Sequence, residues 1–503
     1  MATVQRAQRE PTPPGCASGP ARAGALAAEP DPRLARHFRL RDLVPLSVSS
    51  VGPMFSVAAT GGVMAAQAGW WTLPAIGILA VPFVTSSFVF RLLNRHFPHA
   101  GASYHWSARV VGRGISRYQA WILILAYFLS IPPIAIPAGS YTFQLLLPHA
   151  RPSAPVSLGF SLFWLCFAAL PLLLGARPTA RITQVFFAVE LVSLAGFAVL
   201  GATRLSHLAV PVHFGSPPIG GILIVAVIAA TILDGWEIDS YAAEESVRPR
   251  ADPGIGGIVG AVGALVFYAV LYPLMLAETP MHSLAGSVDP LAVWAQRLVP
   301  GAPWLMLVPV LASTAGGLWL TSYILTRSLY AMGRENLLPR WIAALNRHRV
   351  PSTAVVVVLG SAVVVVMLQL LVTSLTSFFS LVLAAAGFFL LAEFFLDSVT
   401  AVVFLTVGHR RLPDVALQPH AHRVLSFAAV ASSVMMGGLL VAFFVYGPRA
   451  IGDGIDQTLA VLLGAGVLFA WRTRRRPVTP YVVADDDPPA STPAGVTQPD
   501  HRP

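Results

Sequence analysis

The sequence predicts an all-α integral membrane protein with twelve transmembrane helices, and composition and hydropathy are the two observations behind this fold class. Of 503 residues, 55% are hydrophobic and only 11% are charged, whereas a soluble globular protein typically carries about a quarter charged residues. The mean hydropathy of +0.68 is typical of a chain that resides in lipid. Because a helix needs roughly 20 apolar residues to cross the hydrocarbon core, each long uncharged run is a candidate span.

Twelve such runs follow one another along the chain. The first six lie near residues 43–67, 72–93, 117–146, 156–175, 182–203 and 219–243. The other six lie near residues 256–278, 303–330, 351–373, 377–406, 424–447 and 456–471. The flanking residues 1–42 and 473–503 contain no apolar run of this length and are expected to be mobile tails.

The distribution of basic residues predicts the orientation of the chain. All 33 basic residues are arginines, and with the N-terminus inside, the inner segments hold 29 of them. The outer loops hold four, Arg151, Arg204, Arg297 and Arg449. Arginine favours cytoplasmic loops, so both termini are expected in the cytoplasm, with the protein in the cell membrane. The net charge of +10 then suits anionic inner-leaflet lipids, and no basic patch with interleaved aromatics indicates a nucleic-acid partner.

Two of the predicted spans are interrupted by helix-breaking residues. Gly52-Pro53 lies near the middle of the first span, and Asp234-Gly235 interrupts the sixth. Glycine and proline also occur as harmless kinks in membrane helices, but interruptions at corresponding positions of two halves indicate a binding site near the midplane. Spans one and six are five apart, which predicts repeats over residues 43–203 and 219–406, with the helices of 424–471 appended. Five is odd, so the two repeats would have opposite topologies.

Three segments, in order, carry motifs. They are RHFPHAGASYHWSARVVG, LDGWEIDSYAAEESVRP and TRSLYAMGRENLLPRWIAALNRHRVPS. Together they resemble the amino acid–polyamine–organocation (APC) superfamily of permeases. Asp234 stands where that family usually has serine or another small residue, and Glu335-Asn336 where it has Asp-Gly. The resemblance implies the five-plus-five inverted-repeat (LeuT-like) fold and secondary transport of amino acids or related organic amines.

Broken helices expose peptide groups that could hold an amino acid. The N-terminus of a half-helix carries partial positive charge and suits a carboxylate, whereas freed carbonyls suit an ammonium group. We expect the carboxylate on the amides, and the amine on the carbonyls, of the candidate substrate-binding residues. These are Val51, Gly52, Pro53, Met54, Phe55, Ser56, Thr231, Asp234, Gly235 and Trp236.

Two of these residues allow more than one interpretation. Asp234 could face the pocket and favour a cationic substrate, or it could cap the following half-helix in an Asp-x-x-Glu capping box with Glu237. Trp236 could form a cation–π contact with the substrate or pack in the interior. The resemblance implies a role in gating and proton response for Glu237, which matches a recurrent glutamate of the family.

Intramembrane acids are candidate coupling sites. Glu190 is the one charged residue between Arg181 and Arg204, and proton-coupled members of the resembled family carry a lysine at about this place. A proton gradient is the expected driving force, with Glu190 as the coupling site. A structural pair of Glu190 with an arginine or a hydroxyl, or a lumen-facing position without a coupling role, are the alternatives that the sequence leaves open. Ser313 and Thr314 match a hydroxyl pair of sodium-coupled members, so sodium remains an alternative.

A further pair of acids lies in the tenth span. Glu393 and Asp397 are one helical turn apart and so share a face. One of them could be protonated, one could pair with an arginine such as Arg327, or both could face the pocket and reinforce a preference for cations. The sequence leaves these three arrangements open.

Other functional classes leave weaker signals. An exchanger without ion coupling and a polytopic sensor remain alternatives to a driven permease. A membrane enzyme would need converging nucleophiles or metal ligands, and the one tight histidine group, His96, His99 and His105, has no cysteine or paired acid beside it in sequence. We expect no enzyme activity, no metal and no cofactor, and the sequence does not predict an oligomeric state.

Overall fold

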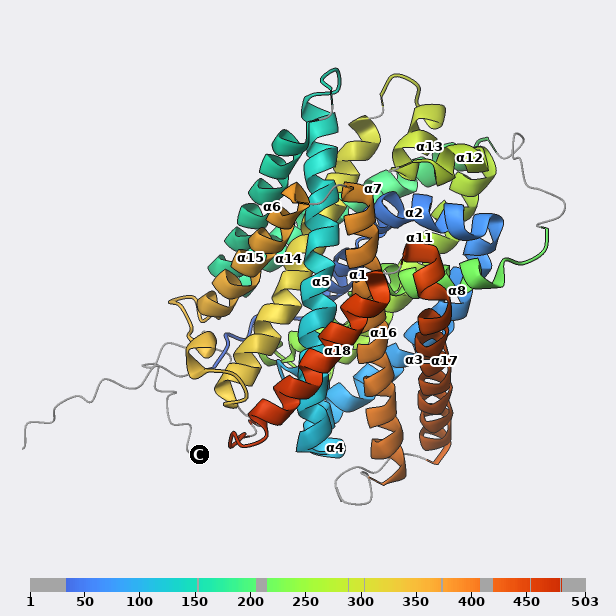
Figure 1. Cartoon of the computed structure of the whole chain (residues 1–503). Coiled ribbons are helices and arrows are strands. Elements are labelled where there is room, and N and C mark those ends of the chain that lie inside the picture. The colour runs from blue at the N-terminus through green and yellow to red at the C-terminus, as the bar shows by residue number, and fades with distance from the viewer. Residues whose placement is uncertain are drawn as a thin grey trace, which may run out of the picture. The chain divides into compact units, whose positions relative to one another are not determined.

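The computed structural model describes residues 33–151, 153–204, 215–287, 289–302, 304–371, 374–407, 419–452, 454–479 and 481. Helices dominate this part of the chain (Figure 1). Most of the two predicted tails, residues 1–32 and 482–503, lies outside the described residues. The predicted fold class is therefore confirmed as all-α.

The helices follow the predicted spans closely. The first half contains α1 (Leu40–Val51), α2 (Pro53–Ala68), α3 (Thr72–His96), α4 (Ala102–Val110), α5 (Arg113–Leu146), α6 (Ala154–Leu174) and α7 (Ala176–Ala202). The second half contains α8 (Ile219–Ile228), α9 (Ala230–Leu233), α10 (Ile238–Tyr241), α11 (Asp252–Glu278), α12 (Met281–Ala285), α13 (Pro290–Leu298), α14 (Trp304–Arg334), α15 (Ser352–Met367) and α16 (Leu375–Thr406). Two helices close the chain, α17 (Pro419–Ile451) and α18 (Gly454–Thr473). Four short 3-10 turns join them, η1 (Gly69–Trp71), η3 (Ala243–Glu245), η4 (Arg340–Ala343) and η5 (Leu368–Leu370).

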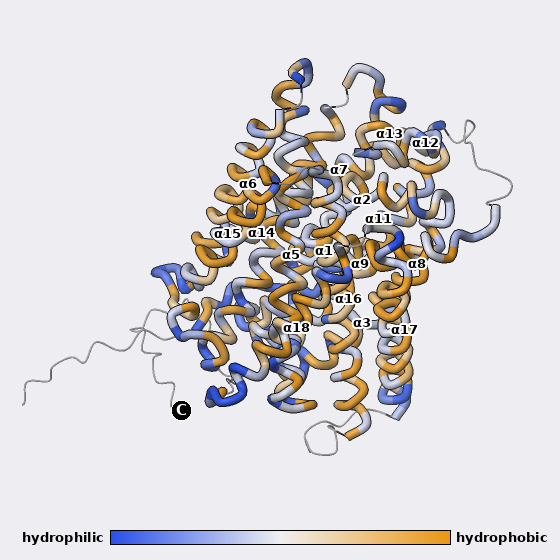
Figure 2. Tube along the Cα trace, viewed as in Figure 1, coloured by the Kyte–Doolittle hydropathy of each residue, from blue (hydrophilic) through white to orange (hydrophobic). Residues whose placement is uncertain are grey.

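The helices have the length and composition of membrane spans. Ten helical runs among the described residues are long and apolar enough to cross a bilayer, and one of them, Leu40–His96, covers two predicted spans. The sixth predicted span appears as the shorter apolar helix Ile219–Leu233. Large apolar side chains lie exposed on the outer helices, such as Val192 and Phe427, and hydrophilic segments gather mainly toward the helix ends (Figure 2). The chain is a multi-pass membrane protein; the total of twelve spans stays a prediction.

The two interrupted helices lie inside the bundle. α1 packs against α7, α11 and α14, and α2 packs against α8 and α14. α8 and α9 pack in turn against α16. α17 covers α16 and α3, and α18 lies along α5. The segments that were predicted to carry the site are therefore held on several sides by long helices.

Two short helices were not predicted. α12 and α13 follow α11, and both pack against α2. α13 begins at Pro290, and the carboxylate of Asp289 accepts a hydrogen bond from the amide of Ala292 at 3.0 Å, which is the usual chemistry of a helix N-cap. They escaped prediction because neither is long enough to cross a membrane.

Parts of both predicted tails pack against the helices. Leu34 and Phe38 are buried, and the amide of Phe38 donates to the carbonyl of Glu245 at 2.9 Å. Beyond α18, the amide of Tyr481 donates to Glu335 Oε1 at 2.9 Å. Residues 34–39, 474–479 and 481 therefore belong to the packed body, on one side of the bundle that we call the terminal face.

Candidate functional site

The first interruption lies at Gly52. α1 ends at Val51 and α2 begins at Pro53, with Gly52 between them in the left-handed conformation, φ 56° and ψ 59°. Glycine adopts this conformation without a steric cost, and proline suits the first position of a helix because that position needs no amide donor. The sequence Gly-Pro thus encodes both the end of one half-helix and the start of the next.

The second interruption spans residues 234–237, between α9 and α10. Gly235 has φ 109°, a conformation that disfavours side chains. A Cβ placed on Gly235 would lie 2.6 Å from the carbonyl carbon of Ser50 and 2.7 Å from the amide nitrogen of Val51. The two interruptions therefore meet at backbone contact, which only glycine permits.

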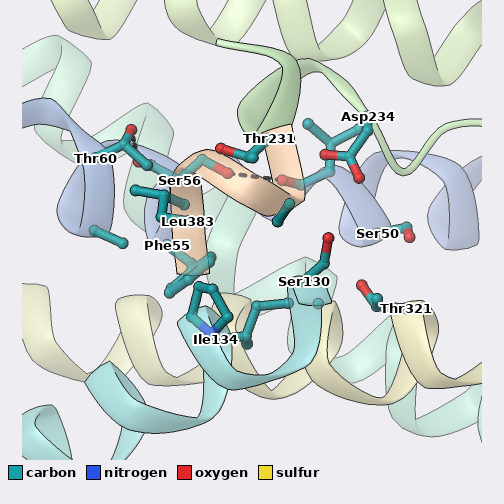
Figure 3. A pocket seen from close by; sticks show the side chains of 15 residues that line it. Ser50, Phe55, Ser56, Thr60, Ser130, Ile134, Thr231, Asp234, Thr321 and Leu383 are labelled. Carbon is teal, nitrogen blue, oxygen red and sulfur yellow. Dashed lines mark hydrogen bonds between the residues drawn. The ribbon is translucent and has the colours of Figure 1, made fainter. Parts of the chain in front are cut away.

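A pocket lies beside this meeting point (Figure 3). Its wall combines one carboxylate, six hydroxyl groups and several apolar side chains, contributed by α1, α2, α5, α9, the second interruption, α14 and α16. The lining residues are Ser50, Val51, Phe55, Ser56, Ala59, Thr60, Ser130, Pro133, Ile134, Thr231, Asp234, Gly317, Thr321, Leu383 and Ala386. Of the ten predicted substrate-binding residues, the five that line it are Val51, Phe55, Ser56, Thr231 and Asp234.

The backbone amides of the first interruption already have hydrogen-bond acceptors, whereas the sequence predicted that they would be free to bind a substrate carboxylate. Met54 N–H donates to Glu190 Oε1 at 3.0 Å, and Phe55 N–H donates to Ser313 Oγ at 3.1 Å. The amides of Gly52 and Ser56 bind backbone carbonyls. A substrate carboxylate would therefore have to displace one of these acceptors.

Asp234 is partly buried and lies on the pocket wall. The side-chain cap on the next half-helix, one of the two roles considered for Asp234, is not formed by the described residues: α10 begins at Ile238, and its cap residue is Glu237. Glu237 Oε2 instead accepts from the amide of Gly235 at 2.7 Å. The geometry favours the interpretation in which Asp234 faces the pocket.

Trp236 does not line the pocket. It is 1% exposed and packs edge-to-face on Phe90, with ring centroids 5.1 Å apart, and beside Phe394 at 5.5 Å. These contacts match the interpretation of Trp236 as an interior packing aromatic.

Glu190 joins the first interruption to α14. Its Oε1 accepts from Met54 N–H and from the hydroxyl of Ser313 at 2.6 Å. Its Oε2 is buried without a hydrogen-bond partner among the described residues. Thr314 does not take part, because its hydroxyl donates to the carbonyl of Val310 at 2.6 Å.

The acids of α16 meet neighbouring hydroxyl groups rather than the pocket. Ser103 Oγ lies 3.1 Å from Glu393 Oε1 and 2.7 Å from Asp397 Oδ2. Arg327, which was considered as an arginine partner of these two acids, binds Glu245 instead, with Nε 2.7 Å from Oε1. Neither acid lines the pocket.

The terminal face contains a second buried ion pair. Arg334 binds Glu244 at 2.6 Å, and the guanidinium also stacks 3.7 Å above the ring centre of Tyr481. Burial alone would raise the pKa of Glu244, but the charge and hydrogen bonds of Arg334 lower it to about 2. This pair is therefore ionised throughout the physiological pH range.

Two histidines of the predicted group lie together beside Glu335. His99 and His105 stack with ring centres 3.8 Å apart, and each has one nitrogen within 3.3 Å of Glu335 Oε1. Burial and the neighbouring His99 lower the pKa of His105 to about 4. The three ligand atoms lie within 4.8 Å of one another, but Arg334 lies 3.2 Å from His99 Nε2, and this charge opposes a metal cation.

Comparisons with known proteins agree with this architecture. Residues 42–468 match the family model described as amino acid permease. The branched-chain amino acid permease BcaP of Lactococcus lactis subsp. cremoris (strain MG1363) is 23% identical over 335 residues, 63% of this chain and 72% of that protein. The L-methionine/branched-chain amino acid exporter YjeH of Escherichia coli (strain K12) is 22% identical over 62% of this chain and 72% of its own length. The large neutral amino acids transporter small subunit 2 of Homo sapiens is 24% identical over 55% and 54%.

Proposed function

Because this chain belongs to the amino acid permease family, we propose that it is a secondary transporter that moves amino acids or related organic amines by alternating access. The observation that carries this proposal is the contact between two interrupted helices, Gly235 against Ser50, beside a pocket with one carboxylate. Peptide groups freed at mid-helix are tolerated in a membrane where they line a cavity. The proposal includes twelve spans, an inverted repeat, both termini in the cytoplasm and a location in the cell membrane.

The pocket supports a substrate that carries an ammonium group. Asp234 is the one acid on its wall, and hydroxyls such as those of Ser50, Ser130 and Thr321 can accept further hydrogen bonds from such a group. Phe55 and Leu383 supply apolar contact for an aliphatic side chain. The relatives named for branched-chain amino acids favour a neutral amino acid, whereas Asp234 favours a cationic one or an amine without a carboxylate.

We propose that a proton drives transport through Glu190. An ionised carboxyl buried without a counter-charge is costly, and Glu190 has hydrogen-bond donors but no cationic partner among the described ion pairs. Binding of a proton would weaken its hold on the amide of Met54 and so link protonation to the first interruption. Sodium remains the alternative, because the hydroxyl of Thr314 donates to the carbonyl of Val310 and its oxygen lone pairs are left for a cation.

Uptake into proteoliposomes tests the transport activity and the driving ion together. Radiolabelled leucine, arginine and putrescine would be supplied with a pH gradient, with a sodium gradient, or with unlabelled substrate inside and no gradient. Accumulation with the pH gradient alone is the expected result. Exchange without accumulation would indicate an exchanger, and binding without uptake would indicate a sensor.

A further inference from the structure

Glu393 and Asp397 form a compact buried cluster with Ser103 and Tyr241. Both acids are 0% exposed. The phenol of Tyr241 donates to Glu393 Oε1 at 2.6 Å, and Ser103 Oγ lies 2.9 Å from the same phenol. Since Ser103 Oγ is also within 3.1 Å of one oxygen of each acid, the two carboxyl groups are held around a single hydroxyl.

No positive charge balances the two acids within the described residues. Asp397 Oδ1 accepts from the amide of Gln119 at 2.7 Å, and Glu393 Oε2 has no hydrogen-bond partner among the described residues. The groups that contact the cluster directly are uncharged: Gln119 from α5, Ser103 from α4 and Tyr241 from α10. Two further acids lie near it, Glu237, which accepts from Tyr127 of α5, and Asp234 on the pocket wall, and neither adds a positive charge. The described arginines in ion pairs bind Glu244, Glu245 and Asp252 instead. Two negative charges this close in a dry interior repel strongly, so at least one proton must be present.

The cluster is connected to the second interruption. Tyr241 belongs to α10, the half-helix that follows Gly235. Its ring meets that of Tyr127 edge-to-face at 5.7 Å, and the phenol of Tyr127 donates to Glu237 Oε1 at 3.0 Å. Glu237 Oε2 in turn holds the amide of Gly235 at 2.7 Å. Movement of α10 would therefore withdraw a hydrogen-bond donor from Glu393.

We propose that Glu393 and Asp397 bind one proton between them and form a proton site separate from Glu190, whose occupancy depends on the position of α10. The existence of this proton site does not depend on the proposed function. Only its coupling to transport rests on the proposed function. With Tyr241 in place, its phenol stabilises the single negative charge that remains on the pair. When α10 moves away, that charge loses a donor and the pair takes up a second proton.

Infrared spectroscopy of the purified full chain at pH 7 tests the shared proton without a transport assay. Glu393→Gln, Asp397→Asn and the double variant should each lose the carbonyl stretch of the same single protonated carboxyl. Glu335→Gln is the matched control, since its carboxyl accepts from Tyr104 and lies between two histidines, and it should lose none. No loss in any of the α16 variants, or a loss in the double variant that is twice that of each single variant, would overturn the proposal.

A further variant keeps the test decisive if the proteins with substitutions on α16 fail to fold. Tyr241→Phe keeps both carboxyl groups and the aromatic ring but removes the donor to Glu393. It should shift the same infrared band without removing it. A band that is unchanged in Tyr241→Phe would place the proton elsewhere and would contradict the proposal.

Transport measurements then separate this inference from the proposed function. With leucine and arginine as probes, Glu393→Gln and Asp397→Asn should keep exchange but lose accumulation driven by a pH gradient. If the wild type moves neither probe, the transport proposal fails for these substrates while the infrared result still decides the proton site. Full gradient-driven accumulation in both variants would overturn the coupling of this site to transport.

Discussion

Gly235 lies against the backbone of Ser50 so closely that a Cβ on the glycine would be 2.6 Å from the serine carbonyl carbon. The second interruption thus touches the last turn of α1, directly before the first interruption. This contact holds the two interrupted helices close together beside the pocket. It also explains why the second interruption requires glycine and not merely a helix-breaking residue.

Gly235→Ala should reduce transport about tenfold or more, because the strained conformation and the clash with Ser50 each cost roughly 1–3 kcal/mol. The matched control is Gly77→Ala on α3, where an added Cβ meets nothing within 4 Å. Alanine there should leave transport unchanged and stabilise the helix by up to about 1 kcal/mol. Initial uptake rates, normalised to the folded protein recovered by size exclusion, provide the measurement. Equal rates in both variants would show that the close contact is not needed.

Asp234→Asn should raise the KM for arginine about tenfold or more, since a hydrogen bond to a charged group contributes about 1.5–3 kcal/mol. The KM for leucine should change little if leucine places its ammonium group on carbonyls and hydroxyls. Competition of unlabelled arginine against labelled leucine gives both constants in one experiment. An unchanged arginine KM would remove the argument for a cationic preference.

Glu190→Gln should abolish accumulation driven by a pH gradient and leave exchange intact, because glutamine still accepts from Met54 and Ser313 but cannot bind the proton. Thr314→Val is the control, since that hydroxyl only donates within its own helix. Accumulation at several pH values, with the gradient held constant, provides the readout. A Glu190→Gln protein that still concentrates substrate would exclude Glu190 as the coupling residue.

Lowering the pH should reduce the stability of the fold at the terminal face, because the Glu244–Arg334 ion pair is lost when Glu244 is protonated. The pKa of Glu244 is about 2 in the folded protein against the ordinary 4.5, so the pair stabilises the fold above pH 4.5 and loses this contribution as the pH falls toward 2. The difference corresponds to about 3 kcal/mol. Glu244→Gln should therefore melt at a lower temperature than the wild type at pH 7, and the gap should narrow below pH 4.5.

The exposed acid Asp456 supplies the control for this melting series. Asp456→Asn should follow the wild-type melting temperature across the whole pH range, because that side chain has no buried ion pair to lose. A gap between the wild type and Glu244→Gln that does not depend on pH would show that the ion pair is not its cause.

Local sequence was sufficient to predict the two interruptions. Gly52-Pro53 removes an amide donor and permits a left-handed turn, and Asp234-Gly235 combines a residue that competes for backbone hydrogen bonds with one that tolerates positive φ. These are properties of the residues themselves. The long apolar helices were predicted for the same reason, because each needs only its own composition to be recognised.

The composition of the pocket was not predictable from the same signals. Ser130, Thr321 and Leu383 lie on helices far apart in sequence and reach the pocket only through packing. Trp236 packs on Phe90 of α3 and Phe394 of α16, and the amide of Met54 is occupied because Glu190 approaches from α7. Such relations arise between elements, and no single segment encodes them.

Arg334 binds Glu244 and at the same time stacks over Tyr481. A single guanidinium therefore contacts both the partner acid on η3 and the segment that follows the last helix. Recombinant forms shortened at residue 473, or joined there to a fluorescent tag, would remove the ring that covers this ion pair. Kinetic work should begin from a chain that keeps its sequence through residue 481.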